Sequence, residues 1–193
     1  ELELGGRKQA VTTLFCDIRG FTPIAECLPP TELVEMLNEH FTAMVGVIFG
    51  CQGTLDKYIG DEIMAVFGAP FAQPDDAERA VRAALAMRQK NVELNLKRAR
   101  ENRPQFELGM GMNSGEAIAG YVGAPERMEF TVVGDRINTA RRLCGLAEAN
   151  QIIAEQSTYL RVKDLVEAKP LGTVILKGKE KPVRAYEIVR LRG

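Results

Sequence analysis

Two aspartates at the ends of predicted strands are the first candidates for chemistry. Asp17 closes the apolar run QAVTTLFCDI (9–18), and Asp61 lies at the tip of a predicted hairpin in DKYIGDEIMAVFG (56–68). Carboxylate oxygens are the ligands that Mg²⁺ and other hard cations prefer. Each acid alone is also ordinary in a turn, so a metal site requires a fold that brings the two together.

The residues after Asp17 add a second element to this site. Gly20, Phe21 and Thr22 open a predicted helix, and backbone N–H groups at a helix start bind anions. Two acids beside an anion site favour a metal-bound polyphosphate over two unrelated turn acids.

A third group of polar residues lies in VGDRINTARRL. Asn138 and Arg142 are four residues apart, so they project from one face of the predicted helix. An amide and a guanidinium suit a phosphoryl centre that develops charge. Without the two acids, a solvated helix face would be the better interpretation. Lys177 and Lys179, in LKGKEKP, indicate by themselves only a solvated turn.

Other common sites are not supported by the sequence. There is no GxxxxGK[ST] phosphate loop, and GMGMNSG (109–115) lies in a predicted strand instead of opening a helix. The single histidine, His40, excludes a multi-histidine metal site and is expected on a polar helix face. The four cysteines occur singly, as is typical of reduced residues in a cytoplasmic protein.

Composition limits the class of partner. The 193 residues contain 25 Lys and Arg against 26 Asp and Glu, so no net charge recruits nucleic acid or an anionic membrane. The longest apolar run, around residues 44–51, is too short to span a bilayer. We therefore expect no nucleic acid and no membrane contact by this domain. The chain begins at Glu1 and not at Met, which indicates a piece of a longer protein.

Hydrophobic spacing and turn residues predict the elements that position these groups. Residues 1–8 are interpreted as the end of a linker, and 9–193 as one domain. Thr31 is the expected N-cap of a long helix, and Asp75 with Glu78 the capping box of another. The predicted elements are a strand at 9–18, a helix at 31–50, a hairpin at 54–68, a helix at 75–102, a strand pair at 106–123, a strand at 130–133, a helix at 136–150, a strand at 151–154, a short helix at 155–162 and a closing hairpin at 173–189.

This order, β-α-β-β-α-β with additional C-terminal strands and helices, predicts an α+β sandwich of the ferredoxin-like type, with helices on one face of one sheet. In such a sheet the first strand is central and the hairpin strand can be its neighbour. Asp17 and Asp61 would then converge.

Together these motifs resemble the catalytic domain of the class III (universal) nucleotidyl cyclases. LFCDIRGFT is similar to the family's strand with Asp-Ile-x-Gly-Phe-Thr, and LDKYIGDEIMAVFG to its Lys-x-x-Gly-Asp hairpin. FTVVGDRINTARRL is similar to its Gly-x-x-(Val/Ile)-Asn-x-Ala-x-Arg segment, and LKGKEKPVRAYE to its closing hairpin. The resemblance runs from about Ala10 to Val189.

The resemblance implies roles for the residues at these positions. Asp17 and Asp61, with the carbonyl of Ile18, would bind two Mg²⁺ or Mn²⁺ ions per active site. Backbone amides of the segment 18–22, which includes Gly20, Phe21 and Thr22, would hold the β- and γ-phosphates of ATP. The remaining implied roles are ribose positioning by Asn138, stabilisation of the α-phosphoryl transition state by Arg142 and pairing with the triphosphate by Lys177. The product would be 3′,5′-cyclic AMP, with release of pyrophosphate.

Lys57 and Thr131 stand at the base-reading positions of the family. Lys57 can only donate, which suits N1 of adenine and opposes the N1–H of guanine. Thr131 can accept from the adenine amino group but could also turn its hydroxyl to donate, so it discriminates weakly. Threonine at this position resembles the subset of the family that responds to bicarbonate.

The resemblance also implies a homodimer with shared active sites, in which Lys57 and Asp61 of one hairpin serve different sites. A fused regulatory domain outside this chain is expected. Two alternatives remain: a guanylyl cyclase, which Lys57 opposes, and a non-catalytic nucleotide-binding or dimerising module, which the intact acids oppose.

Overall fold

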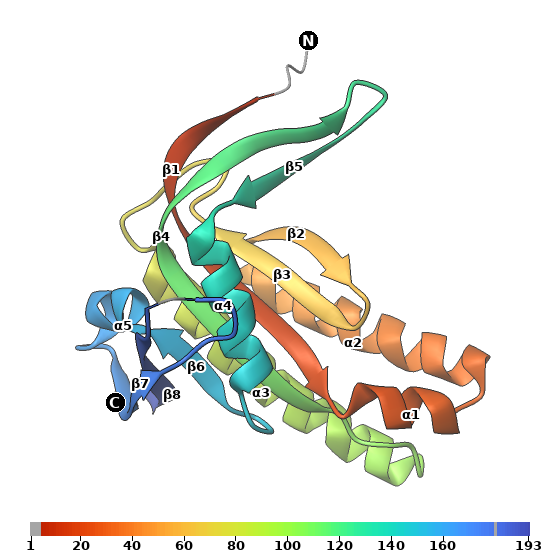
Figure 1. The fold of residues 1–193 in the computed structure, drawn as a ribbon. Coiled ribbons are helices and arrows are strands. Elements are labelled where there is room, and N and C mark those ends of the chain that lie inside the picture. The colour runs from red at the N-terminus through yellow and green to blue at the C-terminus, as the bar shows by residue number, and fades with distance from the viewer. Residues whose placement is uncertain (1–4, 180) are drawn as a thin grey trace.

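The centre of the sheet is β1 (Gly5–Arg19), which pairs antiparallel with β3 on one edge and β4 on the other. The computed structural model describes residues 5–179 and 181–193, and in this part of the chain eight strands form one sheet (Figure 1). Their order is β2-β3-β1-β4-β6-β8-β7, with β5 paired to β4. The order β2-β3-β1-β4 is that of a ferredoxin-like core, which confirms the predicted fold class. The other strands are β2 (Thr54–Ile59), β3 (Glu62–Phe67), β4 (Glu107–Ala124), β5 (Arg127–Val133), β6 (Ile152–Glu155), β7 (Val166–Val174) and β8 (Val183–Leu191).

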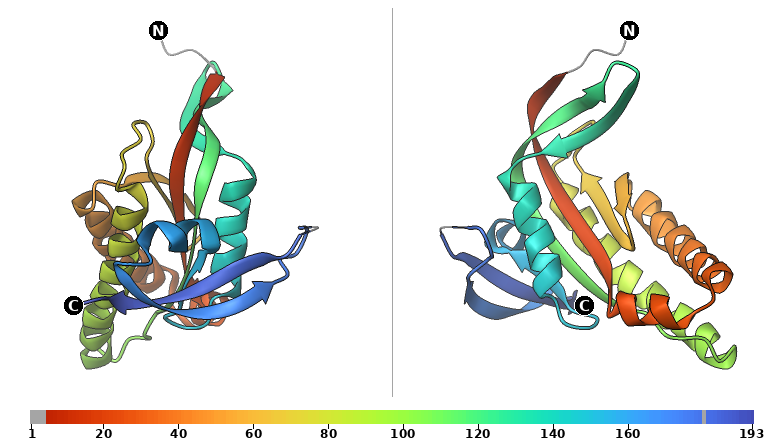
Figure 2. Two further views of the ribbon diagram at one scale, coloured as in Figure 1. Left: turned by 90° about the vertical axis from the view of Figure 1, so that its left-hand side faces the viewer. Right: turned by 45° about the vertical axis from the view of Figure 1, so that its right-hand side comes forward.

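Helices cover both faces of this sheet, not the single face that was predicted. On one face lie α2 (Pro30–Gly50) and α3 (Asp76–Arg100), and on the other lies α4 (Asp135–Leu146) (Figure 2). The reason is the alternation along β1, where Leu14, Cys16 and Ile18 belong to the core under α2 and α3. Val11 and Phe15 belong to the core under α4. Both faces of β1 are apolar, so both need a cover. The short helices are α1 (Phe21–Cys27) and α5 (Gln156–Val162).

The predicted strand pair at 106–123 is one strand of 18 residues, β4, which pairs with β1 along nearly its whole length. Its glycines allow close approach, as expected. A Cβ on Gly111 would overlap the backbone of Ala140 and Cys144 in α4, and one on Gly120 would overlap Gly5. The distal part of β4 pairs with β5 in a projecting arm, whose base also pairs with the start of β1, and we call it the β4–β5 arm (Figure 1).

Several predicted helix and strand boundaries are wrong. α2 begins at Pro30 with Pro29 at the N-cap, because proline suits the first helical position as well as threonine suits the cap. Asp75 precedes α3 without a side-chain capping bond, since its carboxylate accepts from Nε of Arg79 at 3.0 Å. β7 begins seven residues before the predicted hairpin strand at 173.

His40 is fully buried and does not lie on a polar face. It packs beside Phe41 and Phe106, and burial, together with the charge of Arg98, lowers its pKa to about 3. It is therefore a neutral core residue.

The N-terminal boundary also differs from the expected strand. β1 begins at Gly5, four residues before the predicted start, and pairs there with Tyr121. Residues 1–4 of the expected linker lie outside the described part. Among the described residues, no helix has both the length and the apolar character needed to cross a bilayer.

The contact between β4 and α4 generates a stability prediction. Gly111→Ala places a methyl group against the backbone of α4, so we expect the free energy of unfolding to fall by about 1–3 kcal/mol or more. Gly46→Ala, in the interior of α2 with open space around it, is the matched control and should be neutral or stabilising by about 0.5–1 kcal/mol. Urea unfolding of both variants measures the difference, and equal effects would contradict the close packing.

Candidate active site

Asp17 lies at the end of β1, on the face that α4 covers, and is paired with an arginine. Nε of Arg19 donates to Oδ1 of Asp17 at 2.9 Å, and a second guanidinium nitrogen of Arg19 bonds Oδ2. The remaining nitrogen donates to the carbonyls of Gly145 and Ala147, both at 3.1 Å. Arg19 thus ties the acid to the end of α4 and supplies a positive charge where a metal ion was expected.

Asp61 lies in the Gly60–Asp61 turn between β2 and β3, as predicted, and bonds to the end of β1. Its Oδ2 accepts from the backbone N–H of Ile18 at 2.9 Å. The pairing of β1 with β3, which includes Cys16 with Ile63, places the hairpin tip beside the strand end that carries Asp17. The structure therefore brings the two acids to one end of the sheet. The amide of Ile18, expected to bind phosphate, is already used by Asp61.

A third carboxylate, Glu62, joins this site and was not predicted. Ligand atoms of Asp17, Glu62 and Cys144 lie within 4.8 Å of one another. Glu62 also accepts from Nε of Arg141, in α4, at 2.8 Å. The Cys144 thiol donates to the carbonyl of Gly109 at 3.3 Å, and burial raises its pKa well above the usual value, so it is a neutral thiol.

Burial shapes the electrostatics of this acidic end. It raises the pKa of Asp17, against the lowering effect of Arg19, and the charge of Asp61 raises it further. Burial also raises the pKa of Glu62, which Arg141 lowers and which Asp17 and Asp61 raise. Partly buried carboxylates that repel one another require cations nearby. Carboxylate oxygens in this arrangement are suitable ligands for hard divalent ions. In the structure, Arg19 and Arg141 balance the negative charges of Asp17 and Glu62.

The predicted base-reading residues line a cavity of about 340 Å³ on the same face of the sheet. Its polar lining residues are Lys57 of β2, Thr131 of β5, and Asn138 and Arg141 of α4. Phe15 of β1 adds an apolar side chain to the lining. The cavity lies between α4, the β2–β3 hairpin and the β4–β5 arm, whose positions Figure 1 shows. Neither Asp17 nor Asp61 is among its lining residues.

Lys57 does not pair with Asp61, although the two lie on one hairpin. Its Nζ is 3.6 Å from Oδ1 of Asp56 and 3.9 Å from Oε2 of Glu129. Asp56 in turn accepts the Thr131 hydroxyl at 2.8 and 3.0 Å from its two oxygens. Asp56 was not singled out by its sequence context.

Arg142 and Lys177 lie further along the surface. Arg142 points toward the β7–β8 connection, where a Cβ on Gly178 would be 3.2 Å from its guanidinium. Lys177 is exposed in that connection, and Lys179 pairs with Asp135 at 3.0 Å. Asn138 and Arg142 share a helix face as predicted, but only Asn138 lines the cavity.

The segment that was predicted to bind phosphate turns from β1 into a short helix, as expected. Gly20 adopts a left-handed conformation (φ 63°) immediately before α1, which begins at Phe21 and continues through Thr22. Glycine takes this conformation without strain, so the chain can turn from β1 directly into the helix.

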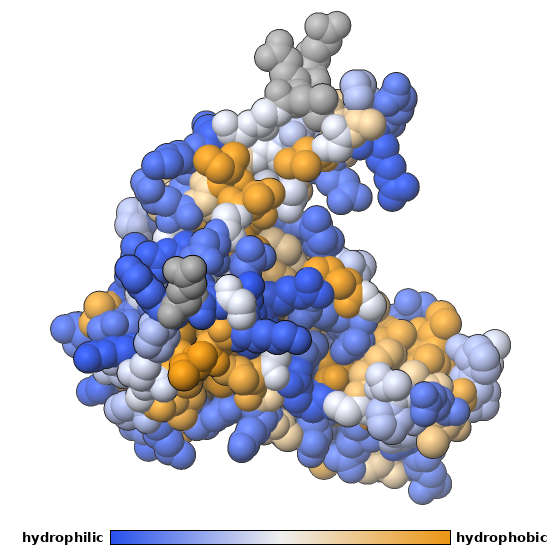
Figure 3. All heavy atoms as spheres, viewed as in Figure 1, coloured by the Kyte–Doolittle hydropathy of each residue, from blue (hydrophilic) through white to orange (hydrophobic). Residues whose placement is uncertain are grey.

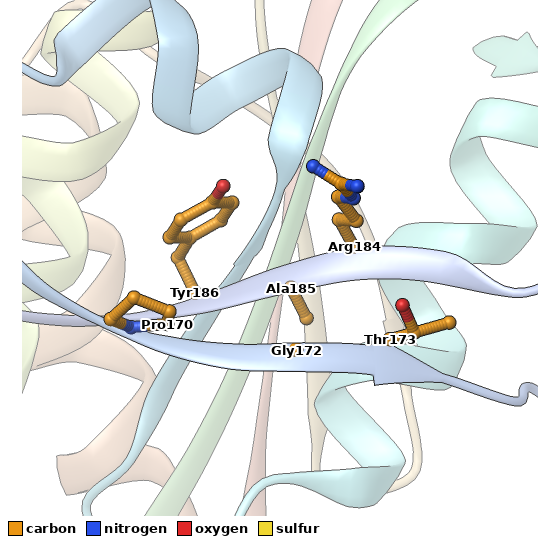
Figure 4. Close-up of a pocket in the computed structure, with 6 residues that line it drawn as sticks. All are labelled: Pro170, Gly172, Thr173, Arg184, Ala185 and Tyr186. Atoms are coloured by element: carbon orange, nitrogen blue, oxygen red, sulfur yellow. The ribbon is translucent and has the colours of Figure 1, made fainter.

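A second cavity, of about 270 Å³, lies on β7 and β8 (Figure 4). It is lined by Pro170, Gly172, Thr173, Arg184, Ala185 and Tyr186 and contains none of the predicted site residues. We therefore assign this cavity no role in the chemistry.

Comparison with known proteins identifies the class. A model of the adenylate and guanylate cyclase catalytic domain matches residues 5–189. Adenylate cyclase 1 of Rhizobium meliloti (strain 1021) is 36% identical over 190 residues, which cover 96% of this chain. The chain spans only 29% of that relative's length, and 31% of the uncharacterized protein Rv1320c of Mycobacterium tuberculosis, which is 36% identical over 188 residues.

Two solved structures resemble the whole domain. The adenylyl cyclase CyaB from P. aeruginosa has a TM-score of 0.94 and 34% identity, with 98% of each chain covered. The guanylyl cyclase Cya2 has a TM-score of 0.92 and 34% identity, with 98% of this chain and 96% of that chain covered. The chain belongs to the adenylate and guanylate cyclase catalytic domain family, as the sequence motifs indicated.

Proposed function

We propose that this domain is an adenylyl cyclase, which converts ATP to 3′,5′-cyclic AMP and pyrophosphate. The observation that carries the proposal is the cavity in which Lys57 and Thr131 lie together with Asn138. An ammonium group beside a hydroxyl suits N1 and the amino group of adenine, whereas guanine presents N1–H and O6 there. The likeness to Adenylate cyclase 1 and CyaB supports this choice, and the likeness to Cya2 makes guanylyl cyclase the second candidate.

For the other predicted residues we propose the roles that the family resemblance implies. Asn138, at the cavity wall, would orient the ribose, and the segment 18–22 would bind phosphate oxygens with the amides of Gly20, Phe21 and Thr22. Arg142, near the β7–β8 connection, would stabilise charge on the α-phosphoryl group as the 3′-oxygen attacks it. Lys177, exposed in that connection, would pair with the triphosphate.

Asp17 and Asp61, with the carbonyl of Ile18, would hold two Mg²⁺ or Mn²⁺ ions, and Glu62 adds a further carboxylate to this end of the sheet. When bound, these ions would neutralise charge on the triphosphate and on the attacking oxygen. Arg19 would have to leave Asp17 as they bind, since it occupies both carboxylate oxygens.

A homodimer with shared sites is part of the proposal. Within one chain, the acidic group that includes Asp17 lies outside the cavity that Lys57 and Thr131 line. The β4–β5 arm also exposes apolar side chains, with Ile118, Val122 and Val133 each between 44 and 53% exposed. Figure 3 shows apolar atoms gathered on this arm. Such an apolar surface favours association with a second copy, and that copy would complete each site.

We also propose that the domain is fused to a regulatory domain and lies in the cytoplasm. A fused regulatory domain is expected because the chain spans less than a third of the length of Adenylate cyclase 1. The four cysteines are free, which agrees with a cytoplasmic location.

The first test measures nucleotide turnover with Mn²⁺. Purified protein should form a cyclic monophosphate from ATP at a higher kcat/KM than from GTP, and chelation of the metal should abolish the reaction. Asp17→Asn removes a charged ligand worth several kcal/mol, so we expect a loss of at least about 100-fold. A preference for GTP would contradict the substrate assignment, and an active Asp17→Asn protein would contradict the metal assignment.

The second test examines the shared site by mixing inactive variants. Lys57→Ala and Asp61→Ala homodimers should each be inactive, while a mixed dimer should contain one intact site and one site with both defects. Random pairing makes about half of the dimers mixed, so recovery should approach roughly a quarter of the wild-type rate. Subunit exchange is verified by tagged pull-down. No recovery after verified exchange would show that both residues serve the same site.

The third test concerns bicarbonate, which is proposed because threonine occupies position 131. We expect a modest rise in the rate of ATP cyclisation with added bicarbonate at fixed pH and ionic strength. An equal rise with chloride would contradict a specific response and would leave the cyclase assignment unchanged.

A further inference from the structure

Asp56 is a buried acid beside both base-reading residues. Its side chain is only 3% exposed, and it bonds the Thr131 hydroxyl through both oxygens, at 2.8 and 3.0 Å. The ammonium group of Lys57 is 3.6 Å from the same carboxylate. Burial raises the pKa of Asp56, while the Thr131 hydrogen bond, the charge of Lys57 and a hydrogen bond with the backbone of Val132 lower it. These three partners favour the ionised form.

A β-bulge explains how two adjacent residues, Asp56 and Lys57, lie on one side of β2. The register of β2 against β3 shifts between Leu55 and Lys57, so Asp56 is the extra residue of the bulge. Leu55 packs into the core under α2, and the ring of Tyr58 packs at a tilt against that of Phe41 of α2, with the ring centroids 4.3 Å apart. Asp56 and Lys57, between them, lie on the other side of β2, where Lys57 lines the cavity and Asp56 bonds Thr131. In a regular strand, adjacent side chains would point to opposite faces.

The carboxylate determines what Thr131 can offer to a ligand. An ionised carboxylate only accepts, so the Thr131 hydroxyl must donate its single proton to Asp56. The lone pairs of the Thr131 oxygen then remain as acceptors toward the cavity. An acceptor suits the amino group of adenine and opposes O6 of guanine, which also accepts. The ambiguity of a free threonine hydroxyl is thereby removed.

The geometry assigns to Asp56 the role of a positioning residue for base selection. It holds Thr131 as an acceptor next to the donor Lys57, so the pair matches adenine and mismatches guanine. This inference rests on the proposed adenylyl cyclase function. A purely structural role, in which Asp56 only ties the β4–β5 arm to β2, would affect both nucleotides alike.

The test is Asp56→Asn, because asparagine keeps the shape and can donate to the Thr131 oxygen, which frees the hydroxyl to serve guanine. The ratio of kcat/KM for ATP to that for GTP should fall about tenfold. Glu129→Gln is the matched control, since Glu129 lies 3.9 Å from Lys57 but forms no bond with Thr131 among those described. It should leave the ratio within about twofold of wild type. Melting temperatures report any loss of stability in each variant.

A double-mutant cycle with Thr131→Val isolates the route of the effect. Valine has no hydroxyl to orient, so adding Asp56→Asn to Thr131→Val should not change the nucleotide ratio further. A further fall in the double variant would show that Asp56 acts by another route. If Asp56→Asn lowers kcat/KM for ATP and for GTP equally, so that their ratio is unchanged, Asp56 has only a structural role and the inference is wrong.

Two further measurements separate this inference from the proposed function. Binding of 3′-deoxy-ATP and 3′-deoxy-GTP, which lack the attacking hydroxyl, should show the same change of ratio without any reaction. A wild-type protein that prefers GTP would overturn the proposed function, whereas an ATP preference unchanged in Asp56→Asn overturns only the role of Asp56. If that variant does not fold, Thr131→Asn replaces it. Asp56 should take the amide N–H and turn the amide oxygen to the base, so ATP preference should persist, and its loss would contradict the inference.

Discussion

The site depends on the central position of β1, which is hydrogen-bonded on both edges and covered on both faces. Between Val11 and Ile18 its alternating side chains supply two apolar cores. Asp17 is the first carboxylate along it and is still partly enclosed by α4. A buried carboxylate without a partner is costly, so the fold must provide a cation at this point. Arg19, two residues later, reaches back to provide it.

The same requirement organises the neighbouring acids. Glu62 is held by Arg141 of α4, and Asp61 by the backbone N–H of Ile18. Each bond joins two elements that are distant in sequence, so the acidic end also links the hairpin and α4 to β1. Under the proposed function, a divalent ion would have to displace Arg19 from Asp17, so the free energy of that ion pair would subtract from the free energy of metal binding.

Several local features of the site could be predicted from patterns along the chain. The strand that ends in Asp17, the Gly60–Asp61 turn and the i, i+4 spacing of Asn138 and Arg142 are local signals, and the structure contains each of them. The burial of individual side chains was harder to predict. His40 was expected on a polar helix face, but it lies in the core. The residues that surround it there, such as Phe106 and Arg98, come from segments that are distant in the sequence.

The sequence by itself determined the order of the core elements, the family and the positions of the acids, because these depend on side-chain type and on spacing within one strand, turn or helix. Only the tertiary structure decided which groups face one another. The bulge at Asp56 exists only in the pairing of β2 with β3, and the bond to Thr131 joins residues 75 positions apart. Glu62 of β3 and Arg141 of α4 likewise pair only because α4 packs on the sheet. Such contacts leave no periodic signal in a single sequence, because the free energy that selects them comes from burial and charge pairing between distant segments.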